Sequence, residues 1–551
     1  MSALKTQKGR AFNAADATPM SNNMFNKGTA FSECERQAFH MRGLFPAAVE
    51  TLEQQTARCY KQFQEMSTPL QKFIYLNQLQ EQNATLFYSL VTSHIEEMIP
   101  IVYTPVVGEA CVKYSSIWRK PIGLFISAKD KGHIREVLDS WKNPVELIVV
   151  SDGSRILGLG DLGTNGMGIP VGKLSLYVAA ALFHPECTLP ILLDVGCNRA
   201  EIRDAPDYLG LRQERLPDEE YYPFVAEFMA AVKDKWPECL VQFEDFQNPR
   251  CFKLLDQYFT KQLCFNDDIQ GTGAVITSGF INAVKVSGIP IKEQRLLFFG
   301  AGSAANGVGS MIATWMAEQL GVDVKETRKQ IRMIDSKGLI TVHRTNLDEH
   351  KRDWVCDAAD CKDNVAIVRD FKPTALMGLS GQPKQFSKEV LEEMCKHCKR
   401  PIVFALSNPT SKSECTAEEA YTYTDGTCIF ASGSPFAPVT YKGKTYTPGQ
   451  GNNMYIFPGL GFGAKLAKAK VVTEDMIMST AITLAGCVSK EQLEQGMIYP
   501  RVADVQDISR KVAAGVIRTA IKNGVCQLSP VPEDIDKYVA DSQWKVEYPH
   551  M

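Results

Sequence analysis

The chain lacks any apolar run long enough to cross a membrane as a helix. Its longest apolar stretch, around residues 174–183, falls short of the roughly 18 residues that a membrane helix needs. The formal net charge is only -3, so there is no basic excess to favour nucleic acid or an anionic lipid surface. We therefore expect no nucleic-acid partner and no membrane association.

A disulfide framework, internal repeats and low-complexity tracts are also absent. The 16 cysteines are scattered over 551 residues, which is typical of free thiols in a reducing compartment. The densest group comprises Cys356, Cys361, Cys395 and Cys398, with His397 inside the last pair. A zinc site at this group is the less favoured alternative, because the first spacing is loose and the surrounding pattern is helical.

The first thirty residues contain no apolar core of the kind that a secretory signal requires. Lys5, Lys8 and Arg10 precede the first acid, Asp16. A basic prefix is also found in mitochondrial presequences, but nothing else in this segment strengthens that interpretation. We expect a cytoplasmic protein, with a mitochondrial location as the second possibility.

The chain has the composition of an ordinary soluble globular protein, with 45% hydrophobic and 22% charged residues, and it is too long for a single core. Apolar residues at three-to-four spacing predict helices up to about Lys120, and short β-rich runs alternate with helical segments after Pro121. We expect an α/β protein with a helical N-terminal domain (1–120), a central parallel-sheet α/β domain (121–266 plus 454–525), a Rossmann-type dinucleotide-binding domain (267–453) and a C-terminal tail (526–551).

Two glycine clusters compete for the role of dinucleotide site. The first, Gly158-x-Gly160-x-x-Gly163, contains Asp161, whose charge would repel a pyrophosphate, so we expect a tight loop lining a cavity. The second follows the buried strand 295–300 and opens the helix 307–320. The tight turn, the approach to the pyrophosphate and the close helix packing are assigned to Gly300, Gly302 and Ala305.

The choice of cofactor depends on the strand that ends at Asp335, where a ribose-binding acid is expected. Ser336 and Lys337 follow it directly, with further cations downstream, and a 2′-phosphate needs a hydroxyl and cations at this place. NADP is therefore favoured and NAD is the alternative. The predicted cofactor-binding residues are Gly300, Gly302, Ser303, Ala304, Ala305, Asp335, Ser336, Lys337, Arg352 and Asn408.

Two pairs of acids, Glu244-Asp245 and Asp267-Asp268, lie among amides, aromatics and glycines where neutralising cations would normally stand. Carboxylates gathered in this way repel one another, and a hard divalent cation such as Mg²⁺ or Mn²⁺ prefers oxygen ligands of this kind. The first pair also closes the expected strand 240–246, and open α/β sheets bind ligands at the carboxyl ends of their strands. Two acidic loop ends facing water are the alternative.

Lys173 is a candidate general base. It precedes the apolar stretch 174–183, where burial and a helix N-terminus would both favour the neutral amine. A lysine that merely extends along the helix end towards solvent is the alternative. Tyr103 is expected at a loop or helix edge, and Asn408 at the tip of a strand that points towards the nicotinamide.

Together these motifs closely resemble one family, malic enzyme, the metal-dependent oxidative decarboxylase of malate. The similarity extends in order over roughly residues 26–463, through the stretches NKGTAF, YTPVVGEAC, SDGSRILGLGDLGTNGMGIPVGKL, FEDFQNPR, FNDDIQGTGAV, GAGSAANGVG, ALSNPTSKSEC, IFASGSPF and GQGNNMYIFPG. The chain differs at Ser303, where many relatives have an acid in the glycine turn.

The resemblance implies a role for each matched residue. Glu244, Asp245 and Asp268 would bind Mn²⁺ or Mg²⁺. Lys173 would take the proton of the C2 hydroxyl with Asp267 as its partner, and Tyr103 would protonate C3 of the enol. The malate carboxylates would be held by Arg155, Asn408 and Asn453. The family also implies a homodimer or homotetramer.

Three other functions remain open at this stage. An NAD-preferring malic enzyme differs only in the cofactor. A 2-hydroxy acid dehydrogenase without decarboxylation would release the keto acid and no CO₂. A catalytically inactive, dinucleotide-binding regulatory protein would be expected to lack a metal ligand or Lys173, and neither is missing.

Overall fold

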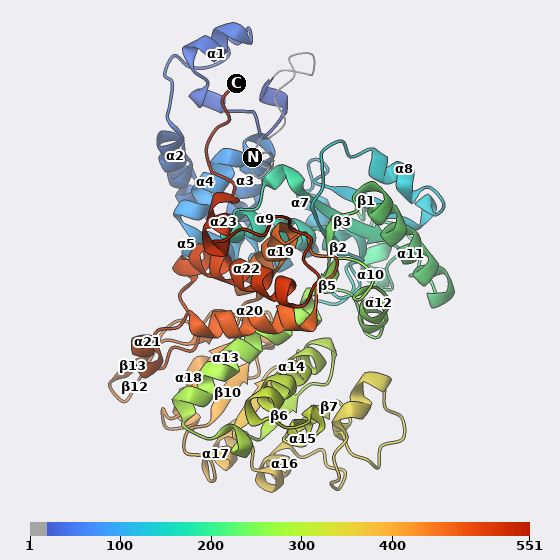
Figure 1. Ribbon diagram of the computed structural model, residues 1–551, viewed down its shortest axis with the longest axis vertical. Coiled ribbons are helices and arrows are strands. Elements are labelled where there is room, and N and C mark those ends of the chain that lie inside the picture. The colour runs from blue at the N-terminus through green and yellow to red at the C-terminus, as the bar shows by residue number, and fades with distance from the viewer. Residues whose placement is uncertain (1–18) are drawn as a thin grey trace. The chain divides into compact units, whose positions relative to one another are not determined.

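The computed structural model describes residues 19–551 and divides into two compact units, each of which is described separately (Figure 1). The first unit comprises the chain up to Ser154, Asp161–Val241 and Leu528–Met551, and the second comprises Arg155–Gly160 and Gln242–Gln527. The basic residues near the N-terminus, Lys5, Lys8 and Arg10, which raised the possibility of a mitochondrial presequence, lie outside the described residues. Within residues 19–551, no helix has the length and apolar character needed to span a bilayer.

The predicted helical N-terminal region is confirmed. Thr51 and Thr68 each form a capping box that starts a helix, and Pro69 occupies the first turn of the second. Phe63, Leu76 and Phe87 pack into one buried cluster between these helices. The helices are α1 (Glu33–Ala38), α2 (Leu52–Glu65), α3 (Pro69–Gln82), α4 (Ala84–Ser93), α5 (Ile95–Val102), α6 (Val106–Val112) and α7 (Tyr114–Ile117).

The C-terminal segment, expected as a polar tail, belongs to the first unit and carries helix α23 (Ile535–Asp541). In Figure 1 its red trace runs beside the blue N-terminal helices. The Tyr548 hydroxyl accepts a hydrogen bond from Asn83 Nδ2 (2.7 Å) and donates one to Gln55 Oε1 (2.6 Å). These contacts fix the end of the chain to α2 and α4.

The first unit also contains parallel strands in the order β1 (Leu124–Ser127), β3 (Thr188–Asp194) and β2 (Leu147–Ser151), with Leu124 opposite Ile191 and Leu147 opposite Thr188. All residues of β2 are buried, which is typical of a parallel strand covered on both faces. Helix α9 (Gly168–Ala181) is buried over its whole length. The remaining helices are α8 (Ile134–Asp139), α10 (Ala200–Arg203) and α11 (Asp218–Lys235).

A seven-stranded sheet forms the centre of the second unit, and it confirms the predicted Rossmann-type domain. Its strands are parallel except β8, which pairs antiparallel with β7. The spatial order is β14 (Gly449–Gln450), β11 (Ile429–Ser432), β10 (Ile402–Ala405), β9 (Ala375–Gly378), β6 (Leu296–Phe299), β7 (Ile331–Asp335) and β8 (Gly338–Leu339).

The other elements of the second unit include two short strands, β4 (Leu240–Phe243), which begins in the first unit, and β5 (Cys264–Asn266), and a hairpin of β12 (Val439–Tyr441) with β13 (Lys444–Tyr446). A π-helical turn, η7 (Asp267–Gly271), runs into α13 (Thr272–Ser287). The remaining helices are α12 (Arg250–Tyr258), α14 (Ser303–Leu320), α15 (Val324–Arg328), α16 (Asn364–Phe371), α17 (Lys388–Cys395), α18 (Ala417–Tyr423), α19 (Phe457–Leu466), α20 (Glu474–Gly486), α21 (Lys490–Glu494) and α22 (Val505–Lys522).

The glycines that follow Asn453 lie in a helix. Gly459, Gly461 and Gly463 lie in α19, and residues 454–525 belong to the second unit. A Cβ atom on Gly459 would lie 2.7 Å from the Cβ of Val512 in α22. The glycines therefore serve close packing of α19 on α22, a tertiary contact that the local sequence pattern does not encode.

We expect Gly463→Ala to lower the free energy of unfolding by about 1–3 kcal/mol, as overpacked cores do. The added methyl group would lie 2.6 Å from the carbonyl oxygen of Ala513 in α22. Gly486→Ala is the matched control, because a Cβ there meets nothing within 4 Å and α20 should gain slightly from losing a glycine. Denaturant unfolding followed by circular dichroism measures both variants, and equal stabilities would contradict the packing role.

Candidate functional site

The dinucleotide turn lies between β6 and α14. Gly300 has φ 126°, and a Cβ there would lie 2.6 Å from the carbonyl oxygen of Leu379 at the end of β9. Only glycine fits both constraints. Helix α14 begins at Ser303, one turn earlier than the expected helix at Gly307, so its free N–H groups follow the glycine turn directly.

Asn306 holds this turn in shape, a role that was not predicted from the sequence. Its Nδ2 donates to the carbonyl oxygens of Ala301 (3.1 Å) and Gly302 (2.8 Å), while its Oδ1 accepts a hydrogen bond from Trp354 Nε1 (2.7 Å). Because the indole N–H fixes the orientation of the amide, both donors point at the turn. The Trp354 contact is long-range, so no local motif could reveal it.

A pocket of about 420 Å³ opens at this turn. Of the predicted cofactor residues, four line it: Gly300, Gly302, Asp335 and Ser336. The other six do not: Ser303, Ala304, Ala305, Lys337, Arg352 and Asn408. Arg155, predicted to bind malate, also lines it. The lining residues that were not predicted are Asn248, Phe299, Ala301, Ile334, Asp348, His350, Lys351, Leu379, Ser380, Gln382 and Gln385.

Asp335, at the end of β7, is paired with two cations. Arg344 donates to both carboxylate oxygens at 2.8 Å, and Lys351 Nζ lies 3.2 Å from Oδ2. Burial alone would raise the pKa of Asp335, but the hydrogen bonds from Arg344, the backbone of Lys337 and Lys351 lower it to about 2. Lys351 Nζ also lies 3.2 Å from Asp348, another residue of the pocket, so the two cations are shared between two carboxylates.

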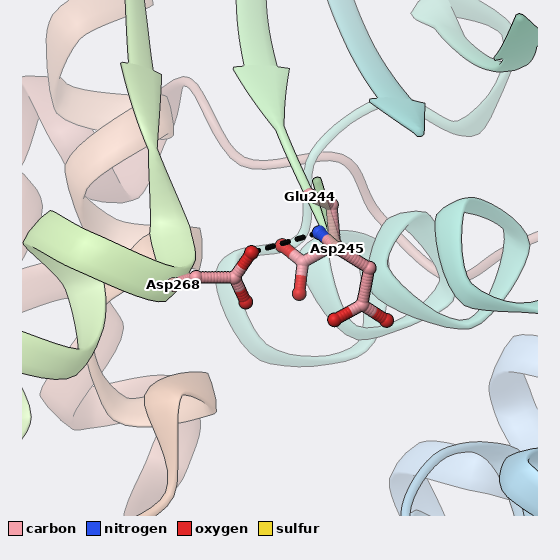
Figure 2. Close-up of side chains that lie close together, drawn as sticks. All are labelled: Glu244, Asp245 and Asp268. Atoms are coloured by element: carbon pink, nitrogen blue, oxygen red, sulfur yellow. Dashed lines mark hydrogen bonds between the residues drawn. The ribbon is translucent and has the colours of Figure 1, made fainter. Parts of the chain in front are cut away.

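Glu244, Asp245 and Asp268 converge, as Figure 2 shows. Each offers a carboxylate oxygen, and these oxygens lie within 4.8 Å of one another. Glu244 and Asp245 are buried and Asp268 is half-buried. Among the described residues this is the one group of three or more acidic, histidine or cysteine side chains placed to share a metal ion, so the alternative zinc group of cysteines and His397 is not formed.

Backbone geometry brings the three acids together. Each acidic segment directly follows a short strand, β4 or β5, and Asp245 adopts φ 57°, in the left-handed region that non-glycine residues seldom occupy. This turn lets the Asp245 N–H donate to Asp268 Oδ2 (2.8 Å), while Asp245 Oδ2 accepts the N–H of Leu157 (3.2 Å). A strained backbone held by such contacts is a feature of ligand sites.

Asp267 directly precedes Asp268 in the chain and is completely buried. Its carboxylate accepts a hydrogen bond from Asn453 Nδ2 at 2.9 Å. The same Nδ2 lies 3.0 Å from Thr272 Oγ1. The structure thus joins two residues that were predicted for different roles, Asp267 as a partner of the base and Asn453 as a malate ligand. The pairing of Asp267 with Lys173 stays a prediction.

Asn408 lies just beyond β10, and its amide orientation is fixed. Its Oδ1 accepts a hydrogen bond from Ser434 Oγ at 2.6 Å, which leaves Nδ2 to act as the donor. Loop Arg155–Gly160 packs on the same residue, since a Cβ on Gly158 would lie 2.5 Å from the Asn408 carbonyl oxygen. The segments carrying two predicted malate ligands, Arg155 and Asn408, are therefore in contact.

In the first unit, Lys173 and Tyr103 face each other. Lys173 is 2% exposed, and its Nζ lies 5.3 Å from the centroid of the Tyr103 ring. A Cβ on Gly172 would lie 2.8 Å from Tyr103 Cδ2, so the glycine makes room for the ring. Lys173 was expected at the helix N-terminus. Because α9 begins at Gly168, it lies instead in the second turn. Because α9 is buried over its whole length, Lys173 does not extend towards solvent, which was the alternative to a role as base.

The first glycine cluster is anchored by an ion pair. Arg215 donates to Asp161 through Nε (2.8 Å) and Nη2 (2.7 Å), and Nη2 also donates to the carbonyl oxygen of Asp152. Asp161 Oδ1 accepts the N–H of Gly163 at 3.0 Å. Asp161 therefore fixes the loop from within, which agrees with the expectation that this cluster is a tight loop and not the dinucleotide site.

The residues present fit both groups that the sequence implies. Three converging carboxylates match the oxygen ligands that Mg²⁺ or Mn²⁺ prefers. The glycine turn, the helix N-terminus and the cationic group at Asp335 match a dinucleotide that carries phosphates. Metal and dinucleotide chemistry together can oxidise an alcohol and polarise the carbonyl group that results.

Comparison with known proteins gives a consistent result. Two family models match: "Malic enzyme, N-terminal domain" at residues 80–259, and "Malic enzyme, NAD binding domain" at residues 269–521. The chain is 52% identical to an NADP-dependent malic enzyme of Dictyostelium discoideum, over 96% of this chain and 97% of that protein. It is 47% identical to NADP-dependent malic enzyme 1 of Arabidopsis thaliana, over 95% and 91% of the two chains.

Solved structures resemble the fold. The malic enzyme of Entamoeba histolytica matches with a TM-score of 0.57 and 21% identity, over 92% of this chain and 91% of that one. The malic enzyme of Pyrococcus horikoshii matches with a TM-score of 0.54 and 24% identity, over 81% and 89%. Identities this low support the shared fold alone.

Asp268→Asn should weaken Mn²⁺ binding at least about 100-fold. It removes a carboxylate ligand, and loss of a residue that only hydrogen-bonds to a ligand already costs about 10–100-fold in metal affinity. Titration calorimetry with Mn²⁺ and no substrate measures the affinity directly. Asp256→Asn, the same change at an exposed acid in α12 outside the three, is the control and should leave the affinity within about twofold. Mn²⁺ binding of normal affinity in a folded Asp268→Asn protein would refute the assignment.

Proposed function

The chain belongs to the malic enzyme family, and we propose that it converts L-malate to pyruvate and CO₂ while reducing NADP to NADPH, with Mn²⁺ or Mg²⁺ required. The observation that carries the proposal is the presence, in one compact unit, of the three converging acids and the dinucleotide pocket. The helix that follows the dinucleotide turn, α14, contacts the turn that carries Asp268, η7. A Cβ on Gly307 of α14 would lie 2.1 Å from the carbonyl oxygen of Ile269 in η7.

Glu244, Asp245 and Asp268 hold the divalent cation in this proposal. A bound cation would supply positive charge that stabilises the negative charge formed on the substrate when C4 leaves as CO₂. NADP supplies the acceptor for the hydride from C2. Without either group, the acids and the turn would not support this reaction.

The protein's own side chains handle the protons and the carboxylates. Lys173, buried in α9, takes the proton of the C2 hydroxyl, and Tyr103 returns a proton to C3 once CO₂ has left. Close contact of the amine with the phenol ring supports a shared role in proton transfer. Arg155, Asn408 and Asn453 orient the malate carboxylates, and the fixed Nδ2 donor of Asn408 supports this role.

The preference for NADP over NAD is supported by the cationic group at β7. Arg344 and Lys351 place cations at the end of β7 and Ser336 lines the pocket, so the 2′-phosphate of NADP would have a cation and a hydroxyl to bind. The relatives named above are NADP-dependent malic enzymes. We also propose a cytoplasmic location, which the scattered cysteines support, and a homodimer or homotetramer, which the family resemblance supports.

Lys173→Ala and Tyr103→Phe should each lower kcat for malate by at least about 100-fold, because general acid–base catalysis contributes on that scale. NADP affinity should stay within about threefold, since neither residue lines the dinucleotide pocket. NADPH formation and quenching of protein fluorescence by NADP measure the two quantities. Near-normal turnover in either variant would remove that residue from the mechanism.

Lys351→Gln should lower kcat/KM for NADP by about tenfold or more and barely change that for NAD, because only NADP presents a phosphate to this cation. Arg352→Gln removes the neighbouring charge, which is exposed and does not line the pocket, and should have little effect. Equal effects in the two variants, or equal losses with both cofactors, would contradict this source of specificity.

A further inference from the structure

A buried glutamate that the proposed reaction does not use, Glu414, lies between two strand ends of the Rossmann-type sheet. It follows β10 by nine residues and has 0% of its surface exposed. Burial raises the pKa of its carboxyl, while hydrogen bonds from neighbouring donors act in the opposite direction. Among residues 19–551 no lysine, arginine or histidine forms an ion pair with it.

The first set of contacts is with the end of β10. Ser407 donates its hydroxyl to Glu414 Oε1 in a short hydrogen bond, and its backbone N–H lies 3.3 Å from Oε2. Because the hydroxyl proton is committed to the carboxylate, Ser407 Oγ acts as an acceptor towards the N–H of Gly381, at 2.9 Å. Glu414 thus fixes the direction of a short chain of hydrogen bonds.

The second set of contacts is with the end of β9. The backbone of Ser380 hydrogen-bonds to the carboxylate, and a Cβ on Gly378 would lie 2.3 Å from Glu414 Cδ, so the carboxyl group rests on this strand end. The main-chain oxygen of Glu414 also accepts the N–H of Phe386 at 3.1 Å. One side chain therefore joins the connections that follow β9 and β10.

Both connections carry residues of the proposed site. Ser380 and Gln382, after β9, line the dinucleotide pocket. Asn408, next to Ser407, presents the Nδ2 donor that Ser434 orients. Glu414 itself does not line the pocket, so it can act on the cofactor or substrate only by setting the position of these neighbours.

We propose that Glu414 is a positioning residue for hydride transfer, which fixes Asn408 relative to the nicotinamide half of the dinucleotide. The inference rests on the proposed function, because it assigns Asn408 a place in the reacting complex. Misplacing a reacting group by about 1 Å can cost about 100-fold in rate, so a residue behind the pocket can affect the chemical step strongly.

Glutamine is the sharpest substitution at this position. It has nearly the size of glutamate, but one of its terminal atoms is a donor. In Glu414→Gln, an amide NH₂ that faces the backbone N–H groups cannot hydrogen-bond to them, and one that faces the Ser407 hydroxyl forces this hydroxyl to act as the acceptor. The chain of hydrogen bonds through Ser407 to Gly381 is then broken or reversed without opening a cavity.

The experiment compares full-length wild type, Glu414→Gln and the control Glu418→Gln, which removes an exposed charge four residues away. Thermal unfolding confirms that each protein is folded. Fluorescence titration gives the affinity for NADP, steady-state assays with malate and Mn²⁺ give kcat, and malate deuterated at C2 gives the isotope effect on hydride transfer. The emission of bound NADPH reports on the nicotinamide environment without turnover.

The expected result for Glu414→Gln is a kcat lowered at least tenfold, a larger deuterium isotope effect, altered NADPH emission and an NADP affinity within about threefold of wild type. The Glu418→Gln control should match wild type in each. A folded Glu414→Gln protein with normal kcat would overturn the inference. So would a loss of activity explained by weaker NADP binding with an unchanged isotope effect, because that pattern indicates a purely structural residue.

Two further outcomes are distinguishable. If wild type forms no NADPH from malate, the proposed function fails, and unchanged NADPH emission in Glu414→Gln would then overturn the positioning role as well. If Glu414→Gln does not fold, Ser407→Ala replaces it, since that change removes the hydroxyl between Glu414 and Gly381 and keeps the carboxylate. Ser407→Ala should lower kcat several-fold with a raised isotope effect, and normal values for both would refute the proposal.

Discussion

Mutual repulsion among Glu244, Asp245 and Asp268 is the constraint on which the proposed site depends. Ligand oxygens within 4.8 Å of one another cost about 3–4 kcal/mol per pair at an effective dielectric constant of about 20. The fold opposes this cost with backbone contacts, notably the left-handed turn at Asp245 and its N–H donated to Asp268. The scaffold therefore holds in advance the arrangement that a divalent cation stabilises.

Three other acids that are partly or fully buried are compensated in different ways. Asp161 is paired with buried Arg215, and Asp335 is paired with Arg344 and Lys351. Glu414 has hydrogen-bond donors but no cation. Asp161 shapes a loop, Asp335 adjoins the dinucleotide pocket, and Glu414 orients its neighbours in the role proposed above.

Much of this arrangement could be predicted from the sequence, because strands, glycine turns and acids at strand ends are local signals. The sheet of the second unit, the turn at Gly300 and a candidate metal site at the two acid pairs follow from such signals, whereas the choice of Glu244, Asp245 and Asp268 came from the family resemblance. Contacts between distant segments could not be predicted in this way. Trp354 orienting Asn306, the glycines of α19 packed on α22, and Lys351 rather than Arg352 at the pocket all depend on tertiary structure.

The contact of Gly307 with Ile269 joins the helix that follows the dinucleotide turn to the π-helical turn that carries Asp268. There is no side chain between the two backbones to absorb a shift of either one. A shift of either backbone on ligand binding would therefore be transmitted to the other. Thermodynamic linkage then makes the effect reciprocal: the factor by which a bound cation changes dinucleotide affinity equals the factor by which the dinucleotide changes cation affinity.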